Sequence, residues 1–206
     1  MNEFYVALTE RFGPSDIQIL PADDSRKTEL ITIRLHGRIP QTILMTKGLH
    51  SYQMPVPERY ADRAHHELFM LLPDYWDLNE PDNPRMNWVT HWLDVLAQRV
   101  VDKQLWHGPG HTIPAGNPEQ AISETMKQKY FFLAEPISLK QKLTPIQLNE
   151  FAVHFLAVIP IFDEELDYKM AKGAHKLHKK FNQHNITEEL DDFRRTALKT
   201  RWRFFG

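Results

Sequence analysis

Histidines are the side chains most able to do chemistry in this chain, which has 11 of them and no cysteine. His107 and His111 flank a Gly-Pro-Gly turn, and a loop can bring two imidazoles four residues apart onto one metal ion. With a third, acidic ligand from elsewhere in the chain, the pair would make a His-dependent metal hydrolase. We favour the alternative, in which the turn is irregular, His111 hydrogen-bonds to backbone carbonyls, and the loop carries Trp106 into a binding surface.

The other histidines have simpler explanations. His175 and His178 stand three residues apart, so they share one face of a predicted helix, but the lysines around them would repel a cation and favour a solvated face. His65 and His66 begin a predicted strand, where adjacent side chains point to opposite faces, so they cannot act as a pair. His154 lies in an apolar strand and is predicted to be a hydrogen-bonded core histidine. We therefore assign no metal ligand and no cofactor.

Catalytic motifs are missing from the sequence. The absence of cysteine excludes disulfides, thiolate nucleophiles and iron–sulfur clusters. There is no Gly-x-Ser-x-Gly elbow, no phosphate-binding glycine loop and no His-Glu-x-x-His. The adjacent acids Glu164-Glu165 and Asp191-Asp192 diverge by about 100° on predicted helices, so we expect them to be solvated or capping. The chain is predicted not to be an enzyme.

The charge of the chain bears on its partners. A formal net charge of −2 and a pI near 6.6 disfavour nucleic acid and anionic membranes as partners of the whole chain. The first six residues lack the basic and apolar regions of a signal peptide. The longest apolar run, 155–162, is far shorter than the roughly 20 residues that cross a bilayer. We expect a soluble, cytoplasmic protein.

The C-terminal segment, 187–206, differs from this average. Five basic residues and three aromatic residues alternate near the end of the chain: Arg194, Arg195, Lys199, Arg201, Arg203, Trp202, Phe204 and Phe205. Such a mixture can bind a phosphate backbone and stack on bases, and it is the only hint of nucleic acid. We favour a segment whose aromatic residues pack on the core while the arginines stay in solvent.

Hydrophobic periodicity predicts the elements that position these residues. Ile31, Ile33 and Leu35 alternate as in a half-buried strand, whereas the run 67–72 is typical of a strand covered on both faces. A spacing of three and four predicts a helix over 85–103, with a start signal at Asn83-Pro84. The remaining predictions are strands at 17–20, 42–46, 130–133 and 151–159 (ended by Pro160), helices at 164–180 and, where the pattern also allows one, at 187–199, and loops at 73–84 and 106–118.

The order of these elements indicates the fold class. Strands and helices do not alternate regularly enough for a doubly wound parallel sheet, and neighbouring strands such as 29–36 and 42–46 favour antiparallel pairs. No linker or repeat divides the chain. We predict one α+β domain over 1–206, with a mixed or antiparallel sheet and flanking helices.

Four segments in register resemble the suppressor-of-fused-like domain family. They are MTKGL at 45–49 with MPVPE at 54–58, ELFMLLP at 67–73, GPGHTIPAG at 108–116, and FLAVIPIFDEEL at 155–166 followed by Tyr168-Lys169. The GPGHTIP stretch is the most specific of them, and the resemblance spans about 29–181. It implies an α+β domain that binds other proteins and has no established catalytic chemistry.

The resemblance also suggests a biological role. The two-lobed animal relative represses Hedgehog signalling by clamping a segment of a transcription factor, whereas 206 residues accommodate one lobe. Single-domain bacterial members are proposed to be immunity proteins. We therefore expect a non-catalytic bacterial immunity protein that neutralises a cognate toxin by direct binding and occlusion. A regulator that binds a peptide or a transcription factor is the alternative within the binding class.

The two proline- and glycine-rich loops are the candidate contact surface, because large side chains on rigid loops lose little freedom on binding. Six residues are predicted to form it: Tyr52, Met54, Glu58, Trp106, His107 and His111. The same residues could instead be packing elements that close one end of the sheet.

Overall fold

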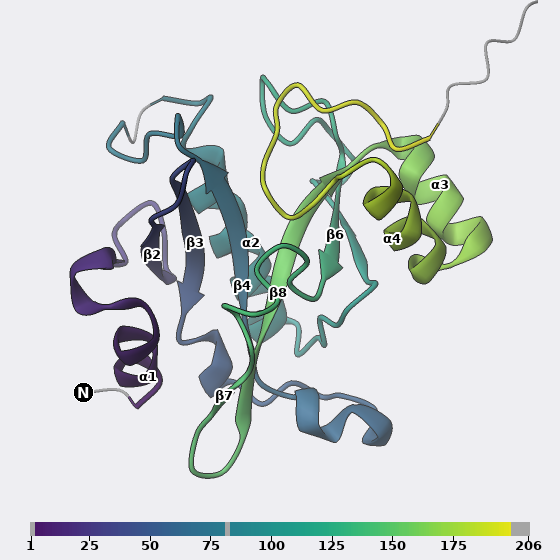
Figure 1. Cartoon of the computed structure of the whole chain (residues 1–206). Coiled ribbons are helices and arrows are strands. Elements are labelled where there is room, and N and C mark those ends of the chain that lie inside the picture. The colour runs from purple at the N-terminus through teal and green to yellow at the C-terminus, as the bar shows by residue number, and fades with distance from the viewer. Residues whose placement is uncertain (1–2, 81–82, 199–206) are drawn as a thin grey trace, which may run out of the picture.

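The computed structural model describes residues 3–80 and 83–198 as an α+β fold around one mixed sheet (Figure 1). The sheet has eight strands in the order β1-β2-β3-β4-β8-β6-β5, and β7 pairs with β8 beside this path. The strands are β1 (Ile17–Leu20), β2 (Glu29–Leu35), β3 (Gln41–Lys47), β4 (His66–Pro73), β5 (Thr112–Pro114), β6 (Tyr130–Ala134), β7 (Ile146–Gln147) and β8 (Ala152–Ile161).

One parallel pair joins two antiparallel halves of the sheet. β4 and β8 run parallel, with His66 opposite His154 and Phe69 opposite Ala157. The other pairs of strands in the described residues are antiparallel. The predicted fold class is therefore confirmed, and the two histidines that open the parallel pair become neighbours in space.

Helices cover both faces of the sheet. They are α1 (Glu3–Phe12), α2 (Trp88–Asp102), α3 (Asp163–Lys172) and α4 (Ala174–Gln183), with short 3-10 helices η1 (Pro14–Asp16), η2 (Leu49–Ser51) and η3 (Glu58–Arg63). α2 packs on one face, and α1 and α4 contribute to the core on the other. In Figure 1, α3 and α4 lie beside the end of the sheet that carries β6.

Burial follows the hydrophobic pattern. In α2 the predicted stripe of Val89, Leu93, Leu96 and Val100 is fully buried against the sheet. Every residue of β4 is buried, and its side chains alternate between the two cores, as expected for a strand covered on both faces. No helix in residues 3–80 and 83–198 is long and apolar enough to cross a membrane.

The structure corrects the predicted helices at the start of the chain and at the start of α2. α1 is absent from the sequence prediction, although its Phe4 and Leu8 are buried in the core. α2 begins at Trp88, after an N-cap at Asn87, so the start predicted at Asn83-Pro84 is wrong. The Asn83 side chain accepts the Arg85 N–H at 3.1 Å and so caps the preceding turn instead of the helix.

The helix predicted over 164–180 is two helices. Gly173 separates α3 from α4 with a φ of 90°, a conformation that glycine adopts without the cost of a Cβ atom. Its N–H donates to the Lys169 carbonyl at 2.7 Å and ends α3. The chain can therefore turn and bring Leu177 and Phe181 of α4 into the core.

Pro160 does not end its strand, and β8 continues to Ile161. Beyond Ala157, β4 no longer pairs with β8. That side of β8 therefore needs no backbone donor at Pro160, whose carbonyl instead accepts from Arg194 at 2.7 Å. A proline at such an unpaired position is compatible with a strand.

The helix allowed over 187–199 is absent from its described part, 187–198. The segment is irregular, with a turn at Asp192 and Phe193, and the Leu190 N–H donates to the Leu71 carbonyl of β4 at 2.8 Å. Phe193 is exposed, while Ala197 is buried in the core. Lys199, Arg201, Arg203 and the aromatic residues Trp202, Phe204 and Phe205 lie outside the described residues.

Two buried glutamates connect the C-terminal segment to the fold. Glu165, predicted to be solvated or capping, is buried and caps α3 by accepting the Phe162 N–H at 3.0 Å. It also accepts two hydrogen bonds from the Arg194 guanidinium at 2.6 and 2.7 Å. The Arg194 guanidinium is also buried, so the expectation that the arginines of this segment stay in solvent is wrong for Arg194. Glu188 accepts the backbone N–H groups of Ile137, Ser138 and Leu139 at 2.9 to 3.1 Å.

A third buried glutamate orders η2. Glu67 on β4 accepts the Gly48 N–H at 2.8 Å, the His50 ring nitrogen Nδ1 at 2.5 Å, and the Thr46 hydroxyl. A buried carboxylate is costly unless several donors satisfy it, and here they come from the loop that follows β3. The glutamate therefore determines how that loop leaves the sheet.

Candidate functional site

η3 and the loop that follows α2 meet at Trp106. The ring centroids of Tyr60 and Trp106 are 5.1 Å apart, and His111 packs edge-on against the indole at 4.8 Å. The Arg59 guanidinium lies 4.9 Å from the centre of the Tyr60 ring. These contacts hold aromatic and cationic side chains in one arrangement at the surface.

Glycine is required where the chain passes Trp106. A Cβ atom on Gly108 would lie 2.5 Å from the Trp106 indole, which is closer than non-bonded atoms approach. Gly110 has a φ of 86° and donates its N–H to the Leu133 carbonyl at 2.7 Å. His111 Nδ1 accepts the Gly108 N–H at 3.3 Å, and a hydrogen bond from this imidazole to the Trp106 backbone partly opposes the lowering of its pKa by burial.

Two hollows adjoin each other at this point. The smaller has a volume of about 540 Å³, and the larger has a volume of about 650 Å³. Both are lined by Arg63, Trp106 and Pro109. We call the two together the Trp106 surface. The smaller hollow is completed by Arg59, Tyr60, Asp62 and His111.

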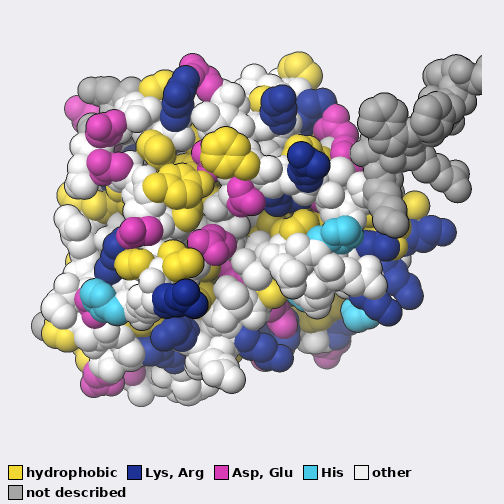
Figure 2. All heavy atoms as spheres, turned by 45° about the horizontal axis from the view of Figure 1, so that its top comes forward, with side chains coloured by type: hydrophobic (Ala, Val, Ile, Leu, Met, Phe, Trp, Pro, Cys, Tyr) yellow, Lys and Arg dark blue, Asp and Glu magenta, His cyan; other side chains and the backbone are white. Residues whose placement is uncertain are grey.

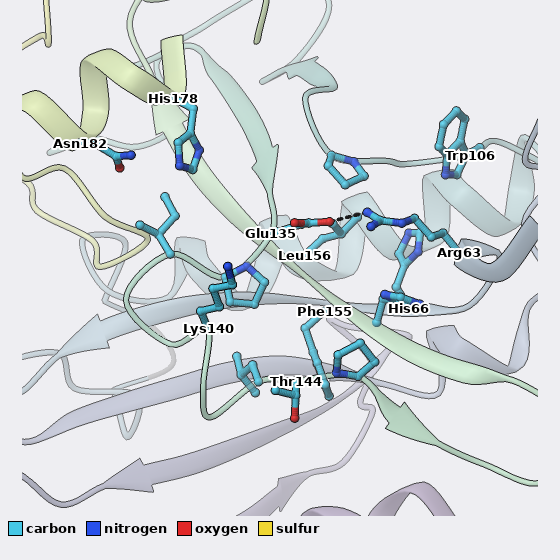
Figure 3. Close-up of a pocket in the computed structure, with 16 residues that line it drawn as sticks. Arg63, His66, Trp106, Glu135, Lys140, Thr144, Phe155, Leu156, His178 and Asn182 are labelled. Carbon is cyan, nitrogen blue, oxygen red and sulfur yellow. Dashed lines mark hydrogen bonds and ion pairs between the residues drawn. The ribbon is translucent and has the colours of Figure 1, made fainter. Parts of the chain in front are cut away.

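The larger hollow lies between the start of the parallel strand pair, the loop after β6, and α4 (Figure 3). Its walls include Phe155 and Leu156 of β8 and the apolar residues Ile137 and Leu143 of the loop. In the view of Figure 3, His178 and Asn182 of α4 lie toward one end and Trp106 toward the other. The hollow thus has apolar walls, polar side chains of α4 at one end and an indole at the other.

Some charged groups at the larger hollow form an ion pair, and one does not. Arg63 and Glu135 form an ion pair that Figure 3 shows across the hollow. Lys140 is exposed and takes part in none of the ion pairs found among the described residues. The one carboxylate that lines the hollow is therefore already paired, while an ammonium group remains available.

A buried imidazole lines the larger hollow. His66 is 2% exposed, and its Nε2 has no hydrogen-bond partner among the described residues. Burial, followed by the neighbouring His107 and His154, lowers the pKa of His66 to about 3, while a hydrogen bond to the Arg63 backbone opposes this change. Since the imidazole is neutral at physiological pH and one ring nitrogen bonds to that backbone, Nε2 offers a free lone pair.

The neighbouring histidines are also held neutral. Burial, then the nearby His111 and Arg99, lowers the pKa of His107 to about 4. His154 was predicted to be a core residue, but it is partly exposed, and its Nε2–H donates to the Asp62 carbonyl at 3.1 Å. Burial also lowers the pKa of His154.

The structure separates the six predicted contact residues. Trp106 and His111 touch each other and line the hollows. Met54 is 2% exposed and His107 is 4% exposed, so the expectation that they contact a partner is corrected to one of core packing. Tyr52 is partly buried against the core. Glu58 is exposed on η3 and lines neither of the two hollows.

Other residues at the site escaped the sequence prediction. Tyr60, Arg63, His66, His154 and His178 line the hollows, yet they come from η3, from the first residues of β4 and β8, and from α4. The parallel register that sets His66 beside His154 depends on strand pairing. A period-two pattern shows that strands exist and not which of them pair, so it carried no signal for this site.

The metal-hydrolase alternative finds no third ligand in the described part of the chain. Within residues 3–80 and 83–198, no three side chains of His, Asp or Glu come together where they could hold a metal ion. His107 is buried, and His111 is engaged by the Gly108 amide. His175 is exposed on α4, whereas His178 lines the larger hollow.

A cationic face adjoins the larger hollow. No acidic residue occurs between Lys169 and Thr187, and α4 exposes Lys176 and Lys179 together with His175. None of the ion pairs found in the described residues includes a lysine of α4. Figure 2 shows dark blue side chains gathered with histidines on the side where α3 and α4 lie.

Comparisons with known proteins identify the family. The family model for Suppressor of fused protein (SUFU) matches residues 25–195. Drosophila Suppressor of Fused is similar in structure, with a TM-score of 0.56 and 16% identity over 92% of this chain and 45% of that chain. A chain in a crystal structure of the Sufu-Fu complex has a TM-score of 0.55 and 16% identity, over 92% of this chain and 82% of that chain.

These matches agree with one another over nearly the whole described chain. At 16% identity the two structures show a shared fold. The chain spans less than half of the length of the Drosophila protein. No curated protein sequence matches it. Because the family model covers most of the sequence, the resemblance of the four segments is confirmed, and the chain belongs to the Suppressor of fused protein (SUFU) family.

Proposed function

We propose that this chain is a non-catalytic protein-binding domain and that the Trp106 surface is where it contacts its partner. The observation that carries the proposal is the pair of adjoining hollows that share Arg63, Trp106 and Pro109. Aromatic side chains and arginine are the residue types that contribute most to protein–protein affinity, and they do so in pockets that exclude water.

The arrangement of the surface favours binding. The Tyr60 ring contacts both the Arg59 guanidinium and the Trp106 indole. The His111 ring packs edge-on against the same indole. Side chains that are ordered before binding lose less entropy when a partner arrives. The site also gathers histidines and one ion pair without a nucleophile beside its base, which is why we propose contact and not catalysis.

A relative supports the binding class. The similar structure described as the Sufu-Fu complex contains a family member together with a protein partner. The same class is expected here because the fold is shared over 92% of this chain. The identity of the partner is a separate part of the proposal.

We propose further that the partner is a cognate bacterial toxin, as in the role proposed for single-domain bacterial members that the sequence resembles. Neutralisation would follow from occlusion, in which the Trp106 surface covers the active site or substrate groove of the toxin. Charged groups around the hollows, such as Arg59 and Lys140, would determine which toxin is bound.

Co-expression with the product of the adjacent toxin-like gene tests both parts. We expect a complex that co-purifies and restores growth, and we expect Arg59→Glu to weaken it. Lys27→Glu makes the same change of charge at an exposed residue outside the hollows and should leave the complex unchanged. If no complex forms and growth is not restored, the toxin role is wrong. Equal effects of the two variants would exclude the Trp106 surface.

A further inference from the structure

One residue that lines the larger hollow carries a polar atom that nothing in the described structure satisfies. His66 is part of the lining, and its Nε2 is buried and unpartnered. One ring nitrogen is already bonded to the Arg63 backbone, and the ring is neutral, so Nε2 can only accept a hydrogen bond. An unsatisfied buried polar group lowers the stability of a fold. A ligand with an O–H or N–H donor at this point would recover that loss.

The walls restrict the shape of such a ligand. Phe155, Leu156, Ile137, Leu143 and Pro109 give the hollow apolar sides, and its volume is about 650 Å³. That volume is in the range of pockets that bury drug-sized ligands or a few residues of a peptide. A serine hydroxyl would satisfy His66 and leave the walls uncovered, whereas a phenylalanine ring would cover the walls and leave His66 unpaired.

The rim restricts the charge of the occupant. Lys140 and His178 line the hollow, and Glu135 is already paired with Arg63. Asn182 lines it one helical turn after His178, and Lys179 shares the face of Asn182 because it precedes it by three residues. A partner segment that lies along α4 and enters the hollow therefore meets cationic side chains that are not already paired with carboxylates of this chain.

We propose that the larger hollow binds a tyrosine side chain carried by an acidic segment of a protein partner. The phenol ring covers the apolar walls, its O–H donates to His66 Nε2, and carboxylates on either side meet Lys140 and the lysines of α4. Tyrosine also carries large contact area on two rotatable bonds, so it loses little entropy on burial. This inference rests on the proposed protein-binding function and names the chemistry of the partner.

The first test uses the tyrosine side chain itself. In ¹⁵N-labelled protein, titration with p-cresol should shift the His66 Nε2 resonance in a saturable manner, because that atom gains a donor. Toluene, which has the same ring without the hydroxyl, should bind about tenfold or more weakly, as expected when a buried polar group is left unpaired. Equal binding of p-cresol and toluene, or no change at His66, would overturn the proposal.

Two variants of His66 isolate the acceptor. His66→Asn retains an N–H donor near the position of Nδ1 and removes the atom at Nε2, whereas His66→Gln keeps an acceptor that can reach that position. We expect Asn to abolish the preference for p-cresol over toluene and Gln to retain part of it. If both variants keep the full preference, the phenol does not bond to His66.

A substitution at an exposed residue of the larger hollow tests the same site without changing the core. Thr144 is exposed and lines the larger hollow, so Thr144→Trp should fill the hollow and prevent p-cresol binding in a folded protein. Gln141→Trp adds the same side chain at an exposed residue of the same loop outside the lining, and it should bind p-cresol normally. Equal binding by the two variants would place the phenol elsewhere.

Peptides distinguish a protein partner from a free aromatic molecule. The peptide acetyl-DEYED-amide should bind more tightly than DEFED by about tenfold, more tightly than KKYKK, and less tightly at high salt. If p-cresol binds but the acidic peptide has no advantage over the basic one, the hollow serves a small aromatic molecule and the proposal is wrong. If a toxin complex forms equally well with Thr144→Trp, the tyrosine inference fails while the proposed binding function stands.

Discussion

At the scale of single residues, buried carboxylates connect segments that are distant in the sequence. Glu67, Glu165 and Glu188 are each 1% exposed or less, and each accepts at least three hydrogen bonds. Arg194 also lies over the rings of Phe162 and Phe181. Such groups are expensive to bury unpaired, so they specify which loop packs where.

Removing one partner of the Glu165–Arg194 pair tests this view. We expect Arg194→Met to lower the free energy of unfolding by about 3–5 kcal/mol, because it leaves a buried charge without its partner. Arg38→Met, at an exposed arginine, should change it by less than about 0.5 kcal/mol. Urea unfolding followed by circular dichroism measures both. A loss below 1 kcal/mol for Arg194→Met would mean that Glu165 finds solvent or another donor.

At the scale of elements, the Trp106 loop depends on close backbone approach. Gly108→Ala should displace the indole, because the new Cβ would lie 2.5 Å from it, and should weaken partner binding by about tenfold or more. Gly37→Ala is the matched control, since its Cβ would lie 3.6 Å from the nearest atom. The indole N–H resonance of Trp106 and the affinity for the partner report the effect. An unchanged resonance would contradict it.

The C-terminal segment also shapes the larger hollow through Glu188. Its carboxylate holds the amides of Ile137, Ser138 and Leu139, in the loop that forms one wall. We expect Glu188→Ala to speed hydrogen exchange at those amides by tenfold or more, because they lose a charged acceptor worth about 1.5–3 kcal/mol. Glu189→Ala changes the adjacent, half-exposed residue and should leave their exchange unchanged. Equal protection in both variants would show that the loop is held by other contacts.

At the scale of the whole molecule, the neutral histidines make stability depend on pH. The folded pKa values of about 3 for His66 and about 4 for His107 lie below the unfolded value near 6.5. As the pH falls below 6.5, the unfolded chain takes up protons that the folded chain does not, so the free energy of unfolding decreases. Each histidine contributes about 1.4 kcal/mol per pH unit until the pH reaches its folded pKa.

Urea titrations between pH 7 and pH 4.5 measure this dependence. His107→Asn should reduce the slope by about one proton, whereas His175→Asn, at an exposed residue of α4, should not change it. A stability that is constant over this range would contradict the neutral state of the two buried rings.

The sequence predicted those parts of the fold that depend on local pattern. The stripe of Val89, Leu93, Leu96 and Val100 predicted the body of α2, and the run around Phe69 predicted a strand covered on both faces. These elements can be predicted without knowing what they pack against, because the spacing of apolar residues shows which face of an element is buried. The four segments that resemble the SUFU family could also be recognised from the sequence, because each of them is a contiguous stretch of residues.

The end of the helix prediction shows what local pattern lacks. Gly173 follows the basic residues Lys169 and Lys172, which is a helix-stop signal that the prediction over 164–180 passed over. The direction of the turn depends on the burial of Leu177 and Phe181 in the core. Likewise, Pro160 is compatible with a strand only because β4 stops pairing at Ala157. The turn between α3 and α4 and the length of β8 are therefore both determined by packing between elements that are distant in the sequence.

By itself, the sequence determined the fold class, the family and the loop whose glycines accommodate Trp106. Only the tertiary structure decided that Met54 and His107 are interior residues, and that His66 lies beside His154 with Nε2 facing no partner. The reason is physical: periodicity records which side of an element is apolar, whereas a binding site is made where strand register and helix packing bring several elements together.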